Sequence, residues 1–115
     1  MALHHATPGE VVRLKLVSDP EAQSITLMRT ASFETMHLVV RAGQSLPEHE
    51  FAGSIGLYCV EGDAGITLQG TTHSMTAGDW LYLLPQMRHG ITAKADTSLL
   101  LTLLFDRPEP ATTPE

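Results

Sequence analysis

Short apolar runs separated by glycine-containing turns occupy most of the chain. Residues 11–16, 25–29 and 35–41 alternate or are rich in β-branched residues, and further apolar runs begin near residues 56, 64, 72, 80, 90 and 98. Evenly spaced runs of this length predict antiparallel strands, and no segment has a convincing helical period. The pattern therefore predicts an all-β protein, a sandwich or a barrel.

Turn residues and prolines divide the chain further. The pairs Gln69-Gly70 and Gly62-Asp63 predict tight turns between neighbouring strands. Four of the seven prolines fall in residues 1–10 and 106–115, which are therefore predicted to be tails. A chain of 115 residues with 43% hydrophobic residues suits one domain, here expected over residues 11–105.

Charge and cysteine content exclude several classes of function. The net charge is -6, and the 7 basic residues are scattered, so nucleic acid is not an expected partner. The longest apolar stretch, residues 99–105, is too short to cross a membrane and no leader pattern is present, so a cytoplasmic location is expected. The single cysteine, Cys59, excludes an internal disulfide and is expected in the core.

Two histidines lie in windows with the spacing of a known pair of motifs. Gly43, His49 and Gly62 match a glycine, histidine and glycine spacing in the first window, and Gly78 and His89 match the second. From residue 35 to residue 105 the chain thereby resembles the cupin superfamily. The resemblance implies a single-domain cupin-type double-stranded β-helix, that is, a jelly-roll barrel, with both histidines at the position where cupins hold a metal.

The other metal-ligand positions of the resemblance are occupied by apolar residues. Phe51 and Ile55 stand there, and neither has a lone pair to donate. Two imidazoles alone make a weak site completed by water, so we expect either no cofactor or a weakly bound divalent ion of iron, manganese, nickel or zinc. The resemblance implies that His49 and Phe51 point into the barrel together, which turns Glu48 and Glu50 outward.

Two further histidines are candidates for a third donor. His37 lies within the predicted strand 35–41, and His73 follows the Gly70 turn. An ordinary hydrogen-bonded or partly exposed histidine is the interpretation favoured for each, because no spacing fixes either one near His49.

The function we predict is binding of a small organic ligand in a mostly apolar barrel, with the two motif histidines as polar anchors. Leu57 is expected in the barrel wall, and Arg41 and Arg88 are cations close in sequence to the two windows. The predicted ligand-binding residues are His49, Phe51, Ile55, Trp80, Tyr82, Met87, His89 and Arg41.

Three alternatives stay open, and one assembly is expected. In the first, His49 and His89 are the metal ligands of a cupin enzyme of dioxygenase, isomerase or decarboxylase type. In the second, a histidine acts as a metal-free acid or base with Tyr58 or Tyr82 as its counterpart. In the third, the chain is a sensory module for a separate partner. A homodimer is expected, because the predicted strand 11–16 is free to cross onto a neighbour.

Overall fold

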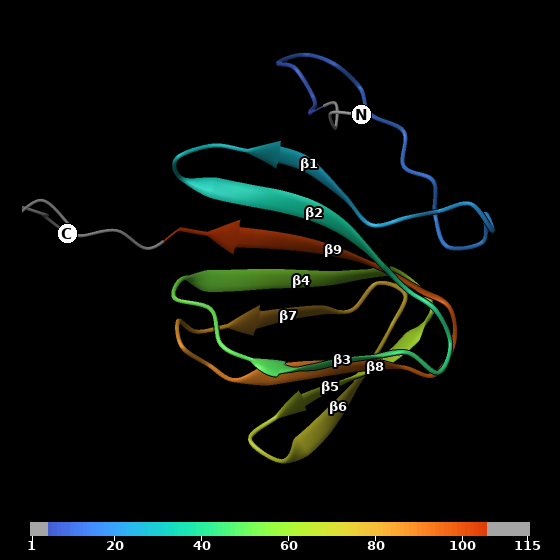
Figure 1. Ribbon diagram of the computed structural model, residues 1–115, viewed down its shortest axis with the longest axis vertical. Helices are drawn as coiled ribbons and strands as arrows, with labels where there is room; N and C mark the ends of the chain where they lie inside the picture. Colours follow the sequence, from blue (N-terminus) through green and yellow to red (C-terminus); the bar gives the residue numbers. More distant parts are fainter. Residues whose placement is uncertain (1–4, 106–115) are drawn as a thin grey trace, which may run out of the picture.

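The computed structural model describes residues 5–105, which form β-strands joined by turns and loops (Figure 1). None of the described residues belongs to a helix that could span a membrane. The strands are β1 (Ile25–Arg29), β2 (Phe33–Val40), β3 (Ser45–His49), β4 (Ser54–Glu61), β5 (Asp63–Leu68), β6 (Thr71–Thr76), β7 (Trp80–Leu83), β8 (His89–Ala93) and β9 (Thr97–Leu104).

The strands form two antiparallel sheets that face each other. One has the order β1-β2-β9-β4-β7 and the other the order β3-β8-β5-β6 (Figure 1). From β3 onward the chain crosses repeatedly between the two sheets, so that strands distant in sequence, such as β3 and β8, become neighbours. This is a jelly-roll arrangement, and the predicted all-β fold class is confirmed.

The strand and turn predictions are largely confirmed. The segment 25–29 coincides with β1, the segment 35–41 overlaps β2, and each of the six later apolar runs lies in one of the strands β4 to β9. Gln69 and Gly70 have φ angles of 50° and 83° and join β5 to β6. Two consecutive positive φ angles are what a two-residue hairpin turn of this kind requires.

The predicted strand over residues 11–16 is wrong. These residues form no strand, and Val11 is 83% exposed. Arg13 and Lys15 instead border a pocket with Ile25 and His37, so the segment covers the outer face of β1 and β2. Leu14 and Leu16 are half-buried while Arg13 and Lys15 are exposed, so the alternation is present here without a hydrogen-bonded ladder.

The predicted tails lie at or beyond the limits of the described residues. Residues 1–4 and the whole C-terminal tail, 106–115, lie outside them. Residues 5–10 are mostly exposed, and the Ala6 amide donates a hydrogen bond of 2.8 Å to the Leu27 carbonyl of β1.

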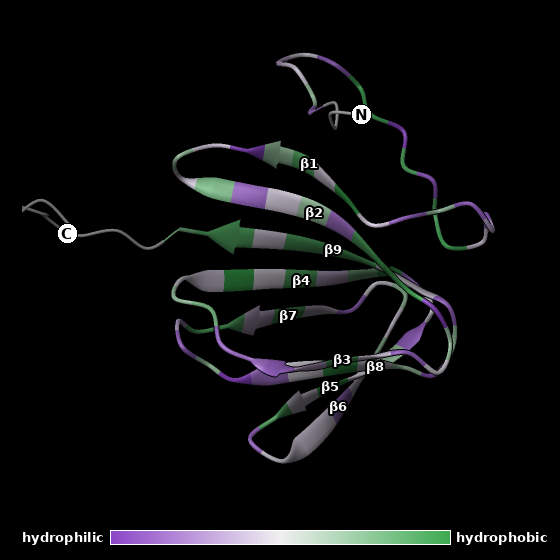
Figure 2. Ribbon diagram, viewed as in Figure 1, coloured by the Kyte–Doolittle hydropathy of each residue, from purple (hydrophilic) through white to green (hydrophobic). Residues whose placement is uncertain are grey.

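The core fills the space between the two sheets. Leu57, Leu99 and Ile66 are fully buried there, and Figure 2 shows that β9 is hydrophobic along most of its length. Cys59 has no exposed surface, which confirms the expected core thiol. Burial, aided by nearby carboxylates, raises the pKa of this thiol.

Candidate functional site

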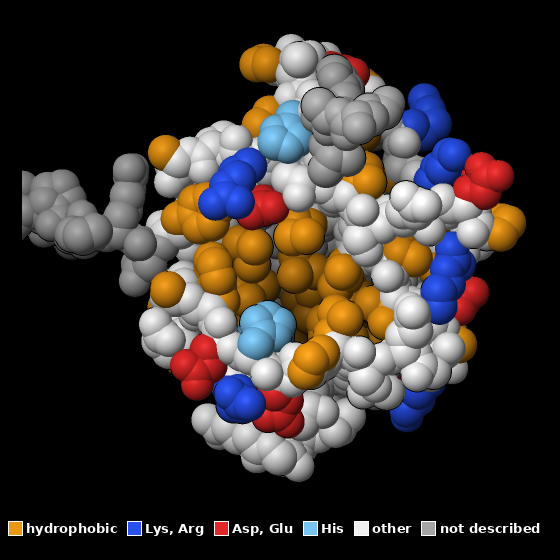
Figure 3. All heavy atoms as spheres, in the orientation of Figure 1, with side chains coloured by type: hydrophobic (Ala, Val, Ile, Leu, Met, Phe, Trp, Pro, Cys, Tyr) orange, Lys and Arg blue, Asp and Glu red, His pale blue; other side chains and the backbone are white. Residues whose placement is uncertain are grey.

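A cavity of about 220 Å³ lies between the two sheets. Figure 3 shows hydrophobic side chains gathered in a hollow of this face, with a histidine side chain at its rim. Two of the ten lining residues are histidines and the other eight are apolar, which makes the cavity wall mostly hydrophobic. The lining residues are Met36, Leu38, Leu46, His49, Phe51, Ile55, His89, Ile91, Leu101 and Leu103.

The two motif histidines meet at this cavity. His49 is the last residue of β3 and His89 the first residue of β8, and the two are direct partners across the strand pair. Their ring centroids are 4.5 Å apart, with the ring planes inclined by 54°. His89 is only 3% exposed, whereas His49 lies at the exposed edge. The pair therefore spans the depth of the site, from its edge to its interior.

Each of these histidines is oriented by the backbone carbonyl two residues before it. His49 Nδ1 lies 3.2 Å from the Pro47 carbonyl oxygen, and His89 Nδ1 lies 3.0 Å from that of Met87. Because a carbonyl oxygen only accepts, Nδ1 must carry the proton that is donated in both bonds. A neutral imidazole then has its lone pair on Nε2. Each imidazole at the cavity, when neutral, therefore has an acceptor nitrogen besides the one bonded to the backbone.

The donor set does not fit a tightly held metal ion. No group of three or more histidine, cysteine, aspartate or glutamate side chains within residues 5–105 is placed to hold one. Phe51 and Ile55 line the cavity where the resemblance would place further ligands. Glu48 is turned to the surface, where it pairs with Arg88 at 3.2 Å. Two imidazoles without a third protein donor retain an ion poorly.

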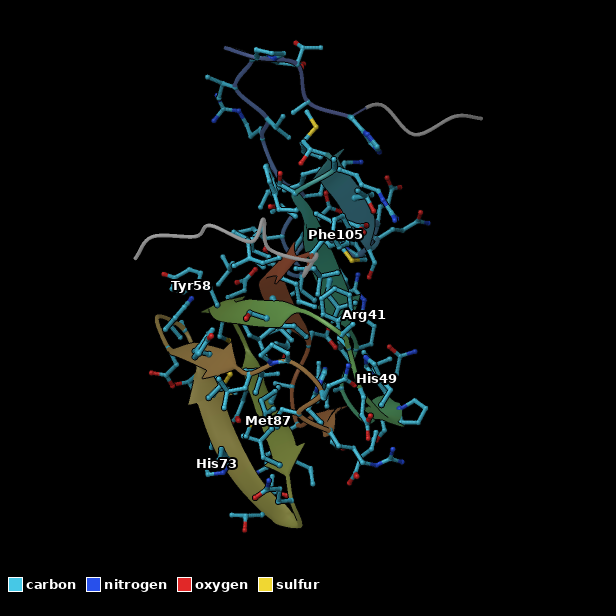
Figure 4. The ribbon with its side chains drawn as sticks, turned by 90° about the vertical axis from the view of Figure 1, so that its left-hand side faces the viewer. Arg41, His49, Tyr58, His73, Met87 and Phe105 are labelled. Atoms are coloured by element: carbon cyan, nitrogen blue, oxygen red, sulfur yellow. The ribbon has the colours of Figure 1, made fainter. Side chains whose placement is uncertain are left out.

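The structure brings neither of the other two candidate histidines to the pair. Met36 and Leu38 line the cavity, so His37 between them points to the opposite face of β2. It is 1% exposed, and burial lowers its pKa. His73 is exposed on the edge strand β6, and in Figure 4 it lies on the other side of the ribbon from His49.

Trp80 and Tyr82 do not line the barrel, so that part of the prediction is wrong. Leu83 is fully buried, and alternation along β7 turns Trp80 and Tyr82 to the outer face of the five-stranded sheet. Their rings stack at a centroid distance of 6.3 Å in a shallow groove of about 490 Å³, which Tyr58 also borders. Tyr58 and Tyr82 are therefore separated by the sheet from the histidine pair, and neither is placed to act as its acid–base counterpart.

A glycine makes room for this outer aromatic groove. A Cβ atom on Gly56 would lie 3.4 Å from Nε1 of Trp80, so the indole lies close over the backbone of β4. The sequence placed these aromatic residues at the wrong face because alternation separates two faces without saying which one is inside.

Arg41 is also not part of the cavity, which corrects another predicted site residue. Its guanidinium donates to the carbonyl oxygens of Val17 at 2.8 Å and Ala22 at 3.2 Å, and pairs with Asp96 at 3.3 Å. Arg41 precedes β3, whereas His49 ends it, so the length of that strand separates them. Its closeness in sequence to the first window does not make it a neighbour of the site.

Met87 and Leu57 belong to the core around the cavity and do not border it. Met87 packs against the buried core and supplies the carbonyl that orients His89. Leu57 is 1% exposed within that core. Sequence reasoning missed six lining residues of the cavity, although the alternation in segments 35–41 and 98–105 contains part of the signal for them: Met36, Leu38, Leu46, Ile91, Leu101 and Leu103.

Comparisons with known proteins address the fold. No protein-family model matches the chain, and no curated protein matches it in sequence. A cupin superfamily protein from Desulfitobacterium hafniense is similar in structure, with a TM-score of 0.76 and 22% identity over 90% of this chain and 100% of that one. An RmlC-like cupin from Shewanella frigidimarina is similar with a TM-score of 0.69 and 18% identity, over 92% and 94% of the two chains.

A larger enzyme contains the same fold. Salicylate 1,2-dioxygenase from Pseudoaminobacter salicylatoxidans, solved with gentisate, matches with a TM-score of 0.66 and 16% identity, over 70% of this chain and 24% of that one. Identities this low show a shared fold alone. The chain therefore has the fold of a small single-domain cupin, as its resemblance to that family predicted.

Proposed function

Because the chain has the cupin fold, we propose that the cavity between its sheets binds a small organic molecule, with His49 and His89 as polar anchors. The observation that supports this most is the pair of adjacent imidazoles in an otherwise apolar cavity, each with Nδ1 bonded to a backbone carbonyl. A mostly apolar concavity with a few convergent polar groups is the usual form of a small-molecule site.

The size and polarity of the cavity limit the ligand class. An apolar cavity of about 150 Å³ accommodates benzene, so about 220 Å³ admits a six-membered ring with a small polar group. The two Nε2 lone pairs accept hydrogen bonds, which favours a hydroxyl or another donor on the ligand. We therefore propose a compact cyclic or branched molecule with an apolar body and a hydrogen-bond donor at one end.

The metal-dependent alternative has one observation in its favour. An Nδ1 atom bonded to a carbonyl, with Nε2 left free, is the arrangement that metal-ligating histidines usually have. His49 and His89 would hold a divalent ion through Nε2, and a bound ion could polarise a ligand oxygen. Because residues 5–105 supply only these two donors at the cavity, we propose weak retention of any ion.

Phenol is a suitable first ligand to test, because it pairs an aromatic ring with one hydroxyl donor. We expect saturable shifts of the His49 and His89 imidazole signals in ¹H–¹³C NMR spectra as phenol is added. His89→Ala should weaken binding by about 3- to 10-fold, the range of one neutral hydrogen bond. The matched control is His73→Ala, which removes an exposed histidine outside the cavity. Equal affinities in these two variants, or no saturable shift in the wild type, would contradict the proposal.

Elemental analysis of protein purified without a histidine tag tests the metal part separately. We expect far less than one equivalent of iron, manganese, nickel or zinc per chain. Near-stoichiometric metal in the wild type that both His49→Ala and His89→Ala lose would overturn weak retention and favour the metal-dependent alternative.

The expected homodimer stays a prediction, and we propose a second copy as the partner of the outer aromatic groove. Trp80 is 63% exposed, Tyr82 50% and Leu104 48%, which together give the sheet an exposed apolar face. Leu100 borders the same groove, so β9 carries apolar side chains on both of its faces. Exposed apolar patches of this kind mark interaction surfaces.

A further inference from the structure

His37 has an unsatisfied polar atom in a buried position. The residue is 1% exposed, and its Nε2 atom has no hydrogen-bond partner within the described part of the chain. It lies on the outer face of β2 opposite Ile25 of β1, with the segment 11–16 passing over it. An unpaired buried donor or acceptor is costly, so such a group calls for a partner that completes it.

A pocket of about 250 Å³ opens beside this histidine. Arg13 and Lys15 bring two positive charges to it from the covering segment, and Glu21 brings one negative charge. Lys15 Nζ lies 3.7 Å from Glu21 Oε1, and both side chains are largely exposed. Gln23 adds an amide at the pocket wall. With His37 neutral, the charged groups of the pocket sum to one positive charge.

We propose that this pocket binds a small oxyanion, a carboxylate or phosphate group, that accepts a hydrogen bond from His37 Nε2–H and faces Arg13 and Lys15. A neutral imidazole can donate from Nε2, and an oxyanion supplies only acceptors, so the two are complementary. The Gln23 amide can donate as well, and Arg and Lys side chains form the strong charge-assisted bonds that oxyanions attract.

The pocket is separate from the histidine cavity and differs from it in chemistry. Met36 and Leu38 line the cavity on the inner face of β2, whereas His37 turns outward between them. Five of the six residues that line the outer pocket are polar or charged, and the sixth, Ile25, is aliphatic. Its ligand is therefore selected by charge, whereas the inner cavity selects an apolar body.

Titration with sodium phosphate and, separately, with sodium acetate tests this proposal, with sodium chloride at equal ionic strength as the reference. The readout is the His37 imidazole signal of the full chain in ¹H–¹³C NMR spectra. A saturable shift with phosphate alone identifies a phosphoryl group, a shift with acetate alone identifies a carboxylate, and shifts with both identify a general oxyanion site. A response no different from that of chloride would overturn the proposal and leave water as the partner of Nε2.

Binding should also perturb the protonation of His37. Burial keeps the pKa of this imidazole low, and a bound anion at Nε2 should raise it by favouring the charged form. The other charged groups facing His37 in the pocket are Arg13, Lys15 and Glu21. An unchanged His37 titration midpoint at saturating anion would contradict direct contact with Nε2.

Charge variants separate a specific site from general attraction. We expect Arg13→Gln and Lys15→Gln each to weaken binding by about 3- to 10-fold, and Glu21→Gln to strengthen it, because Glu21 repels the anion and competes for Lys15. The matched control is Lys94→Gln, which removes an exposed lysine outside this pocket. His37→Leu should abolish the specific response. Equal effects of all the lysine and arginine variants would overturn the proposal, whether or not His37→Leu folds.

Discussion

Replacing Arg41 by glutamine should release the loop before β1 from the sheet. Nη1 donates to the Val17 carbonyl at 2.8 Å, and Nη2 shares the carbonyls of Asp19, Pro20 and Ala22 at 3.2, 3.3 and 3.2 Å. Val17 and Ala22 are buried, so their carbonyls have little access to replacement water. One guanidinium therefore holds the whole turn.

The magnitude of this contribution follows from the geometry. A hydrogen bond to a charged group contributes about 1.5–3 kcal/mol. We count the contacts of Arg41 as two such bonds, because three acceptors share Nη2, and we discount them because the side chain is 29% exposed. The expected loss in the free energy of unfolding is about 2–4 kcal/mol, a large part of the roughly 5–15 kcal/mol that a domain has.

Urea unfolding followed by tryptophan fluorescence measures this loss. The Arg41→Gln midpoint should fall by roughly 1–2 M at a urea dependence of about 2 kcal/mol per M. Arg41→Lys should recover little, because an ammonium cannot reach several carbonyls at once. The matched control is Arg88→Gln, whose 58% exposed side chain pairs with Glu48 at the surface and should contribute less than about 0.5 kcal/mol. Equal midpoints for the Arg41 and Arg88 variants would refute the structural role of Arg41.

Three further predictions concern charge, the core and the outer face. The hydrogen bond from the Ala42 amide, aided by Arg41, lowers the pKa of Asp96 below its ordinary value of 3.8. The ionised Asp96 carboxylate therefore stabilises the fold above pH 3.8, and this stabilisation is lost as the pH falls below that value. The urea midpoint of Asp96→Asn should consequently decline less on acidification than that of the wild type. Cys59 should resist iodoacetamide in the native state and react only in urea, since burial raises its pKa and blocks access; rapid native labelling would contradict its core position. Trp80→Ser should lower the mass measured by analytical ultracentrifugation from that of a dimer to that of a monomer, while Leu84→Ser, an exposed residue outside the groove, should not; a wild-type monomer would exclude the proposed interface.

The sequence alone determined the features that depend on neighbouring residues. The apolar and β-branched run 25–29 and the glycine-separated runs after residue 56 predicted strands that the structure contains. The Gln69-Gly70 turn was predictable because the backbone of a two-residue hairpin needs positive φ angles at both positions. These are local properties of the backbone. The motif spacing around His49 and His89 was enough to single out the two residues that meet at the cavity.

Tertiary structure alone decided which partners these elements have and which of their faces is inside. Residues 11–16 alternate as a strand does, yet they lie across a sheet face. Alternation along β7 could not tell whether Trp80 or Leu81 faces the core, because a period of two only separates the faces. The contacts of Arg41 depend on a segment that folds over from elsewhere in the chain, and the packing of the two sheets decided that His37 lies on the outer face of β2. Contacts between residues far apart in sequence fix all of these, and no local pattern records those contacts.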